Sequence, residues 1–284
     1  MKNRTALHLK KRVLNLYERT HVMGIVNVTP DSFYDGGNYS TTDAAVTQGK
    51  KLVEEGADIL DIGGESTRPG SVPVSIQKEL DRVIPVIEKL STLVDIPLSI
   101  DTTKAMVAET ALRTGADIIN DISGLQFDPY MKEVVVKFKC PVIMMHIRGI
   151  PQTMQSQPSY DDVIREIHQY FENRIEDAIC AGISHEQLLI DPGIGFGKRL
   201  QDNYMILKHL SAFTDLGYPI VIGPSRKSFI GTVLNLPVEE RLEGTAAAVA
   251  AAILSGARIV RVHDVKAMVR VARICDAIKR AGEL

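Results

Sequence analysis

The sequence lacks tryptophan, and only 3 of its 284 residues are cysteine. Cys140, Cys180 and Cys275 are odd in number and far apart, so we expect reduced thiols rather than a disulfide framework or a cysteine zinc site. The chain also lacks a long apolar run, because the stretch 246–254 is too short to cross a bilayer. The first residues contain no apolar block typical of a signal peptide. These absences argue against a membrane partner and predict a cytoplasmic protein.

The charge shows no excess of one sign, since 33 Lys and Arg residues oppose 35 Asp and Glu residues, for a formal net charge of −2. We therefore expect no nucleic-acid partner, and an anionic ligand needs a local basic site. The hydrophobic fraction of 45% is enough for a sizeable core. Residues 1–20 are rich in lysine and arginine. We interpret them as a solvated N-terminal extension, with an RNA-binding segment as the alternative.

Eight short apolar runs rich in isoleucine and valine alternate with helical patterns. Near-continuous apolar strands between helices are typical of a buried parallel sheet. One intervening segment has a clear helical period, because Val163, Ile167 and Phe171 recur every four residues after a candidate N-cap at Ser159. The predicted strands are residues 21–28, 59–64, 98–101, 118–121, 142–146, 188–191, 220–223 and 259–262.

Eight strand–helix units in one run favour a single-domain (β/α)8 TIM barrel over a doubly wound α/β sheet. No linker or break in composition follows residue 20, so the predicted barrel domain spans residues 21–284. In such barrels the active site lies at the carboxyl ends of the strands. Asp264 follows the last strand, where it could simply cap the final helix.

Polar residues stand at the carboxyl end of each predicted strand. A carboxylate or amide is costly to bury there without partners, and helix capping alone does not explain eight such ends. Acceptors and cations together suit a ligand with a hydrogen-bonding ring at one end and an anionic group at the other. The set includes Asn27, Arg68, Asp101, Asn120, His146, Asp191, Lys227, Arg261 and His263.

Seven segments carry these residues apart from His146: 26–33, 61–70, 99–102, 119–122, 191–198, 225–228 and 261–264. In order and spacing they resemble the signature segments of dihydropteroate synthases, and the resemblance covers about residues 21–282. It implies a (β/α)8 barrel and a transferase of folate biosynthesis. The implied reaction condenses 6-hydroxymethyl-7,8-dihydropterin diphosphate with 4-aminobenzoate to give 7,8-dihydropteroate and diphosphate.

The resemblance also implies how the pterin is bound. Asp191 would meet the guanidine-like edge of the ring, since a buried carboxylate can accept two hydrogen bonds from such an edge. Asp101, Asn120 and Lys227 would bind the other ring atoms, and Met145 would line the pocket. His146 would line it too, with a structural role as the alternative. The alternative for the two aspartates is a structural role in holding loops together.

Diphosphate and metal are assigned by the same resemblance. Arg261 and His263 lie two residues apart on one strand, so their side chains share a face. Mg²⁺ takes oxygen ligands, often waters and phosphate oxygens, so one protein ligand, Asn27, can suffice. The alternatives are a turn residue for Asn27 and a histidine bonded to backbone for His263. The expected diphosphate-binding residues are Asn27, Thr67, Arg68, Arg261 and His263, and the expected catalytic residues are Asn27, Arg68, Lys227, Arg261 and His263.

For the second substrate, the resemblance implies a 4-aminobenzoate site between two loops and the ends of later strands, and a homodimer formed through the later helices. The amine is a good nucleophile near neutral pH, so the chemistry needs no dedicated strong base. The residues expected at this site are Phe33, Thr67, Arg68, Pro69, Phe196 and Ser225.

Two other classes of protein share part of this pattern. A pterin-binding methyltransferase domain would share Asp101, Asn120 and Asp191, but has no need of the loops in segments 26–33 and 65–70. A non-catalytic pterin carrier has no need of the cationic residues. Pro224 departs from the family pattern and is expected to stiffen the loop before Ser225, because proline fixes its backbone φ angle.

Overall fold

Eight strands lie parallel and close into a barrel, which confirms the predicted architecture. The computed structural model describes residues 6–10, 12–29 and 41–282. Round the barrel the strands follow chain order, and the last one pairs with the first. The predicted bounds agree with the observed ones to within about two residues. The barrel strands are β3 (His21–Asn27), β4 (Ile59–Gly63), β5 (Leu98–Asp101), β6 (Ile118–Asp121), β7 (Val142–Met145), β8 (Leu188–Asp191), β9 (Ile220–Ile222) and β10 (Ala257–Val262).

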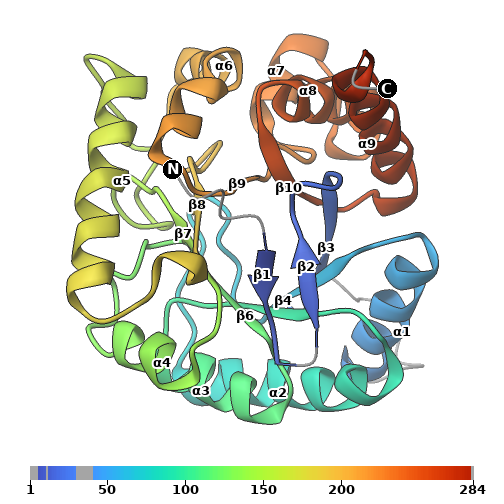
Figure 1. Ribbon diagram of the computed structural model, residues 1–284, viewed down its shortest axis with the longest axis vertical. Coiled ribbons are helices and arrows are strands. Elements are labelled where there is room, and N and C mark those ends of the chain that lie inside the picture. Colours follow the sequence, from blue (N-terminus) through green and yellow to red (C-terminus); the bar gives the residue numbers. More distant parts are fainter. Residues whose placement is uncertain (1–5, 11, 30–40, 283–284) are drawn as a thin grey trace.

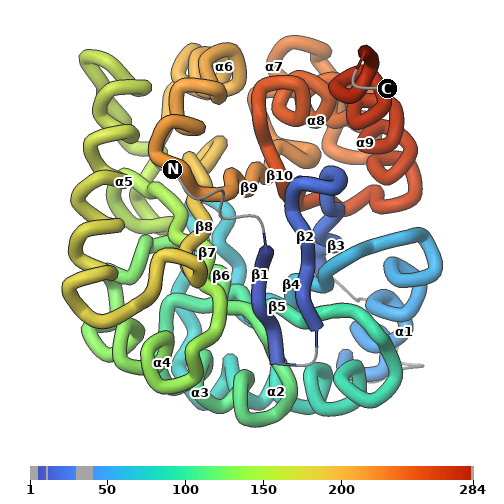
Figure 2. The backbone as a smooth tube through the Cα atoms, in the orientation of Figure 1, coloured from blue at the N-terminus to red at the C-terminus, as the bar shows by residue number. Residues whose placement is uncertain are grey.

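Helices form the outer ring of the molecule (Figure 1). In Figure 2 the chain runs round this ring in order, so that the red carboxyl-terminal unit lies beside the blue amino-terminal one. No helix in the described part of the chain is both long and apolar enough to span a membrane. The helices are α1 (Thr41–Glu54), α2 (Ile76–Leu93), α3 (Ala105–Thr114), α4 (Met131–Phe138), α5 (Val163–Cys180), α6 (Leu200–Lys208), α7 (Ser228–Leu234), α8 (Leu242–Leu254) and α9 (Val265–Arg280).

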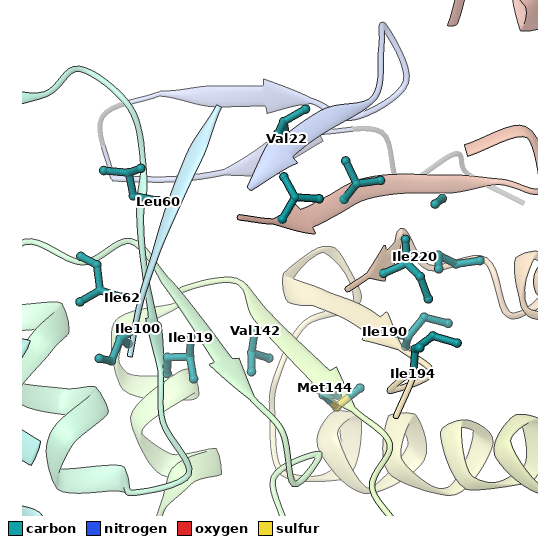
Figure 3. Close-up of a cluster of buried hydrophobic side chains, with 14 of the residues drawn as sticks. Val22, Leu60, Ile62, Ile100, Ile119, Val142, Met144, Ile190, Ile194 and Ile220 are labelled. Atoms are coloured by element: carbon teal, nitrogen blue, oxygen red, sulfur yellow. The ribbon is translucent and has the colours of Figure 1, made fainter. Parts of the chain in front are cut away.

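Side chains along each barrel strand alternate between the helices and the lumen, because successive residues of a strand point to opposite faces. The outward set forms one continuous apolar layer with the buried faces of the helices (Figure 3). Met144 belongs to this layer, whereas Met145 faces the lumen side, as expected for adjacent residues. The labelled members of the layer include Val22, Leu60, Ile62, Ile100, Ile119, Val142, Ile190 and Ile220.

An N-terminal hairpin closes the amino end of the lumen. Strands β1 (Ala6–His8) and β2 (Val13–Asn15) pair antiparallel, and Figure 1 shows them lying across the barrel. Leu7 and Leu16 are buried, so the prediction of a solvated extension is wrong for this segment. Their alternating apolar side chains fill the bottom of the barrel together with the inward residues Met23, Ile59, Ile118, Ile143, Leu189, Val221 and Ile259.

Two helix ends differ from the expected capping. Asp162, not Ser159, caps α5, and its carboxylate accepts the backbone N–H groups of Ile164 and Arg165, both at 3.1 Å. Asp264 stands at the N-cap position of α9, but its side chain makes no capping hydrogen bond. Its carboxylate instead binds Arg226, at 2.8 Å to Nε and 2.6 Å to Nη2. Asp264 therefore links the loops after β9 and β10.

The hairpin generates a stability prediction. Leu16→Ala should lower the free energy of unfolding by about 2–5 kcal/mol, because it leaves a cavity at the barrel floor. Val13→Ala is the matched control in the same hairpin, since Val13 is 55% exposed and Leu16 is 1% exposed. Denaturant unfolding of both variants checks this. A loss of similar size in the two would contradict the packing role of Leu16.

Candidate active site

Strand register brings polar residues from neighbouring strands to one level of the lumen. Asn27 pairs with Gly63, Gly63 with Asp101, and Asp101 with Asn120. Three of these four residues therefore stand in a row at the carboxyl ends of β3, β5 and β6. Gly63 has no side chain, and a Cβ there would lie 3.5 Å from Cβ of Asp101, so the Asp101 side chain packs over this position. The lumen is thus apolar at its amino end and polar at its carboxyl end.

Arg261 crosses this polar level from β10 and contacts two carboxylates. Its Nε donates to Oδ2 of Asp61 at 2.6 Å, and its Nη2 donates to Oδ2 of Asp101 at 2.7 Å. The side-chain amide of Asn120 donates to the same Oδ2 of Asp61 at 3.0 Å. Asp61 is fully buried and holds both neighbours, although the sequence assigned it no role.

Burial and neighbouring charges shift the pKa values of this group. Burial raises the pKa of Asp101 to about 7, against the opposing effect of Arg261. Burial also raises the pKa of Asp191, which Lys227 partly offsets. The pKa of Lys227 falls to about 8 through burial, although Asp191 supports its charge. Titration of Asp101 and Lys227 near neutral pH is typical of functional sites.

The loop after β8 positions Asp191. Its Oδ1 accepts the backbone N–H of Gly193 at 2.7 Å, and its carbonyl accepts the N–H of His146 at 2.9 Å. Lys198 is buried behind this loop, and its Nζ lies 2.9 Å from Nδ1 of His146. The same ammonium donates to the carbonyl oxygens of His146 and Phe196, which fixes the loop against the end of β7. His146 therefore contacts loop residues, not an open pocket.

An apolar wall stands beside the polar row. Ile122, Met145, Ile147 and Met154 form a buried cluster, and the half-buried Phe196 packs against it. The ammonium of Lys227 lies 4.7 Å from the centre of the Phe196 ring, a distance at which a cation is attracted to an aromatic face. A flat ring could pack on this wall while its edges meet the carboxylates and the amide.

The ends of β9 and β10 carry the cationic side of the site. Ser225 Oγ lies 3.0 Å from Nδ1 of His263 and accepts the backbone N–H of His263 at 3.2 Å. Burial lowers the pKa of His263 to about 4, with further lowering by Arg261 and Arg226. The ring is therefore neutral at pH 7. If Ser225 donates to Nδ1, the proton sits on Nε2, which is then a donor for an anion.

The loop between β4 and α2 carries Thr67, Arg68 and Pro69, and three contacts anchor it. Glu65 accepts the N–H of Val74 at 3.0 Å and binds the ammonium of Lys104, so it holds both ends of the loop. Further along, the N–H of Gly70 donates to the carbonyl of Pro151 at 3.1 Å. A cavity of about 180 Å³ opens beside the loop and is lined by Thr67, Asp101, Lys104, Ile122, Phe127 and Ile150, among others.

The donor set at Asn27 fits one kind of metal site. Among the described residues no group of three or more His, Cys, Asp and Glu side chains could hold a metal ion. Asn27 offers a single half-buried amide oxygen at the mouth of the barrel. Such a donor suits a magnesium ion that takes its remaining ligands from water and a phosphate group. Phe33, expected at the 4-aminobenzoate site, lies outside the described residues.

Sequence reasoning missed Asp61, Lys198 and the Lys104–Glu79 ion pair. Asp61 had a usable signal, because it interrupts an apolar strand at an inward position, two residues after Ile59. Lys198 and Lys104 had none, since each lies in a loop and finds its partner on another segment. Ser225 was expected to bind 4-aminobenzoate, whereas its hydroxyl contacts His263 here.

Gly193 generates the next prediction. Its φ is +70°, and a Cβ there would lie 2.0 Å from the carbonyl oxygen of His146. Gly193→Ala should lower the free energy of unfolding by about 2–5 kcal/mol through combined strain and overpacking. Gly70→Ala is the control, because Gly70 has a φ of +80° but no atom within 4 Å of the added Cβ. It should cost only about 1 kcal/mol. Equal losses in denaturant unfolding would show that backbone strain alone acts.

Comparison with known proteins gives consistent matches. The family model described as pterin binding enzyme matches residues 23–263. A curated relative from Synechocystis sp., named dihydropteroate synthase, is 50% identical over 264 residues, which are 93% of this chain and 91% of the relative.

Solved structures agree with this match. A dihydropteroate synthase from Xanthomonas albilineans with 4-aminobenzoic acid is 46% identical, with a TM-score of 0.92 and coverage of 97% of this chain and 98% of that one. The same species' enzyme in complex with 7,8-dihydropteroate is 44% identical, with a TM-score of 0.89 and coverage of 96% and 98%.

Proposed function

The chain belongs to the dihydropteroate synthase family, and we propose on that premise that it condenses 6-hydroxymethyl-7,8-dihydropterin diphosphate with 4-aminobenzoate. The products are 7,8-dihydropteroate and diphosphate, so the chain is a transferase of folate biosynthesis. The observation that carries this conclusion is the lumen itself, where ring-binding groups stand beside a cationic mouth. The relatives are synthases over nearly their whole length, which argues against a methyltransferase domain or a non-catalytic carrier.

The pterin lies in the polar row, against the apolar wall. Asp191 accepts hydrogen bonds from the guanidine-like edge, because a buried carboxylate suits two parallel N–H donors. Asp101 and Asn120 bind the other ring atoms, and Lys227 donates to the ring carbonyl or a ring nitrogen. Met145 supports one face of the ring. Burial strengthens each of these hydrogen bonds, since water cannot compete for the same atoms.

The diphosphate lies at the mouth, near Arg261 and His263, with Thr67 and Arg68 on the facing loop. The bond between the methylene carbon and the ester oxygen breaks, and its electron pair leaves with diphosphate. Cations and N–H donors stabilise the charge that develops on that group. Asn27 would hold a magnesium ion through its side-chain oxygen. When bound, this ion would neutralise part of the negative charge of the diphosphate oxygens.

The second substrate supplies the nucleophile. The amine nitrogen of 4-aminobenzoate forms the new bond to the methylene carbon and then loses one proton to solvent or to diphosphate. The acid would lie between Phe196 and the Thr67–Pro69 loop, with Ser225 and Phe33 beside it. Phe196 offers an apolar face to the benzene ring. No strong base is required, because the amine is not protonated at neutral pH.

A homodimer is part of this proposal. Exposed apolar side chains occur on α7, α8 and α9 and on the segment between α7 and α8, and Ile274 and Ile278 are one turn apart on α9. We infer that these side chains form one apolar patch at the subunit interface, since exposed apolar surface marks interaction sites. A cytoplasmic location and a division into an extension (residues 1–20) and a catalytic domain (residues 21–284) complete the proposal. The patch comprises Val233, Leu234, Val238, Leu254, Ile274 and Ile278.

The decisive test is an assay of magnesium-dependent diphosphate release from the pterin diphosphate and 4-aminobenzoate. Wild-type protein should release one diphosphate per dihydropteroate formed. Asp191→Ala should weaken binding of the pterin by about 100-fold or more, because its N–H donors lose a charged acceptor. No release by the wild type would refute the synthase function. Unimpaired pterin affinity in the variant would refute the role of Asp191 alone.

The dimer has its own test. Ile274→Glu places a charge on the apolar patch and should shift sedimentation towards a monomer, with the barrel still folded by circular dichroism. Met106→Glu is the control, since Met106 is a similarly exposed apolar residue on α3, away from the patch. Dissociation by both variants, or by neither, would contradict an interface at the last helices.

A further inference from the structure

The two guanidinium nitrogens Nε and Nη2 of Arg261, which form a fork, bind two different carboxylates. Nε and Nη2 lie on the same edge of a guanidinium and can bind one carboxylate together. In Arg261 they do not, because Nε binds Asp61 and Nη2 binds Asp101. Arg226 shows the undivided arrangement in the same molecule, since both of its nitrogens bind the single carboxylate of Asp264.

Asp61 has room for the second nitrogen of this fork. Its Oδ2 already accepts from Arg261 and Asn120. Its Oδ1 is buried and has no hydrogen-bond partner among the described residues. A buried acceptor without a partner is costly. A small rotation that moves Nη2 of Arg261 from Asp101 to Oδ1 of Asp61 would place both nitrogens on Asp61 and give Oδ1 a hydrogen-bond donor.

A pterin and Arg261 compete for the same acceptor. The amino-pyrimidine part of a pterin presents N–H donors much as a guanidinium does, and Asp101 is one of the carboxylates proposed to bind that ring. Nη2 of Arg261 donates to Oδ2 of Asp101 at 2.7 Å. Arg261 therefore stands in for a ring donor and keeps this buried carboxylate paired. The ring gains full access to Asp101 only when Nη2 leaves.

We propose that Asp61 is a positioning residue on which Arg261 pivots, so that filling of the pterin pocket and of the diphosphate subsite is coupled. Nε stays on Asp61 throughout. Nη2 moves from Asp101 to Oδ1 of Asp61 as the pterin arrives, and the remaining terminal nitrogen, Nη1, is left to meet a diphosphate oxygen. This inference rests on the proposed function, because it uses the two ligands assigned there.

The coupling must act in both directions. A pterin that takes Asp101 releases Arg261 towards the anion, and an anion that draws Arg261 away frees Asp101 for the ring. Linkage requires the two ligands to strengthen each other by the same factor. Asp61 also holds the amide of Asn120, so its loss should affect both subsites although it touches neither ligand.

The test is a binding cycle by titration calorimetry with two separate probes, 6-hydroxymethylpterin and inorganic diphosphate, with magnesium in every arm. Saturating diphosphate should tighten pterin binding to the wild type by about 5-fold or more, the usual size of such coupling. In Asp61→Asn the tightening of pterin binding by diphosphate should fall below about 2-fold, because an amide has only one oxygen that can accept from Arg261. Diphosphate alone should also bind the variant at least about 10-fold more weakly.

Asp121→Asn is the matched control. Asp121 is equally buried at the end of β6, but its carboxylate binds only its own loop, through Ser123 and Leu125. Its loss should lower thermal stability and leave the coupling factor unchanged. If Asp61→Asn does not fold, Arg261→Lys serves instead. A lysine ammonium keeps the charge but cannot remain on Asp61 while presenting another nitrogen elsewhere, so the coupling should again be lost.

Three outcomes would overturn the inference. The first is no coupling in the wild type, and the second is full coupling in Asp61→Asn or, in its place, Arg261→Lys. The third is equal loss of coupling in Asp121→Asn, which would indicate a general effect of disturbing the barrel end. In each of these cases diphosphate release from the full substrate can still proceed, so the proposed function would stand. A wild type that releases no diphosphate and binds neither probe would overturn both.

Discussion

Inward side chains from eight strands must share one narrow lumen, and this constraint organises the whole molecule. At the amino end the inward positions hold Met23, Ile59, Ile118 and their neighbours, which pack against each other and against the hairpin. At the carboxyl end the same positions hold charged and amide groups. Because a strand supplies at most one inward residue to a given level, the polar groups meet partners from other strands. Contacts such as Arg261 with Asp61 span 200 residues of sequence.

Buried charge is costly unless it is paired, and at the carboxyl end of the barrel one arginine pairs with two carboxylates. Arg261 is shared by two carboxylates, and burial would otherwise disfavour all three charges. Lys198 donates to two backbone carbonyl oxygens and lies 2.9 Å from Nδ1 of His146, and burial lowers its pKa well below the ordinary value although Asp191 opposes this shift. The first arrangement leaves a hydrogen bond that a ligand can exchange. The second arrangement, around Lys198, holds the loop after β8 in place.

The barrel could be predicted from sequence because its strands are short apolar runs ended by glycine, proline or polar residues. The hairpin could not, since strands of three residues carry too short a pattern to be recognised. The residues assigned to the site were found by their position at strand ends. Asp61 escaped because it stands inside a strand and not at its end, although it interrupts the apolar pattern at an inward position. Ser159 was preferred to Asp162 because several polar residues precede α5, and local sequence does not distinguish among them.

The hairpin across the barrel floor has a kinetic consequence. With Leu7 and Leu16 packed on the amino end, the lumen is a well with one mouth, not a tunnel. On the proposed assignment, a ring that binds at Asp101 and Asp191 enters and leaves past the residues assigned to the second substrate. The ligand that binds deepest in the lumen would then bind first and be released last. We therefore expect this single opening to impose an order on binding and release, because a ligand bound at the opening blocks the exit of the one beneath it.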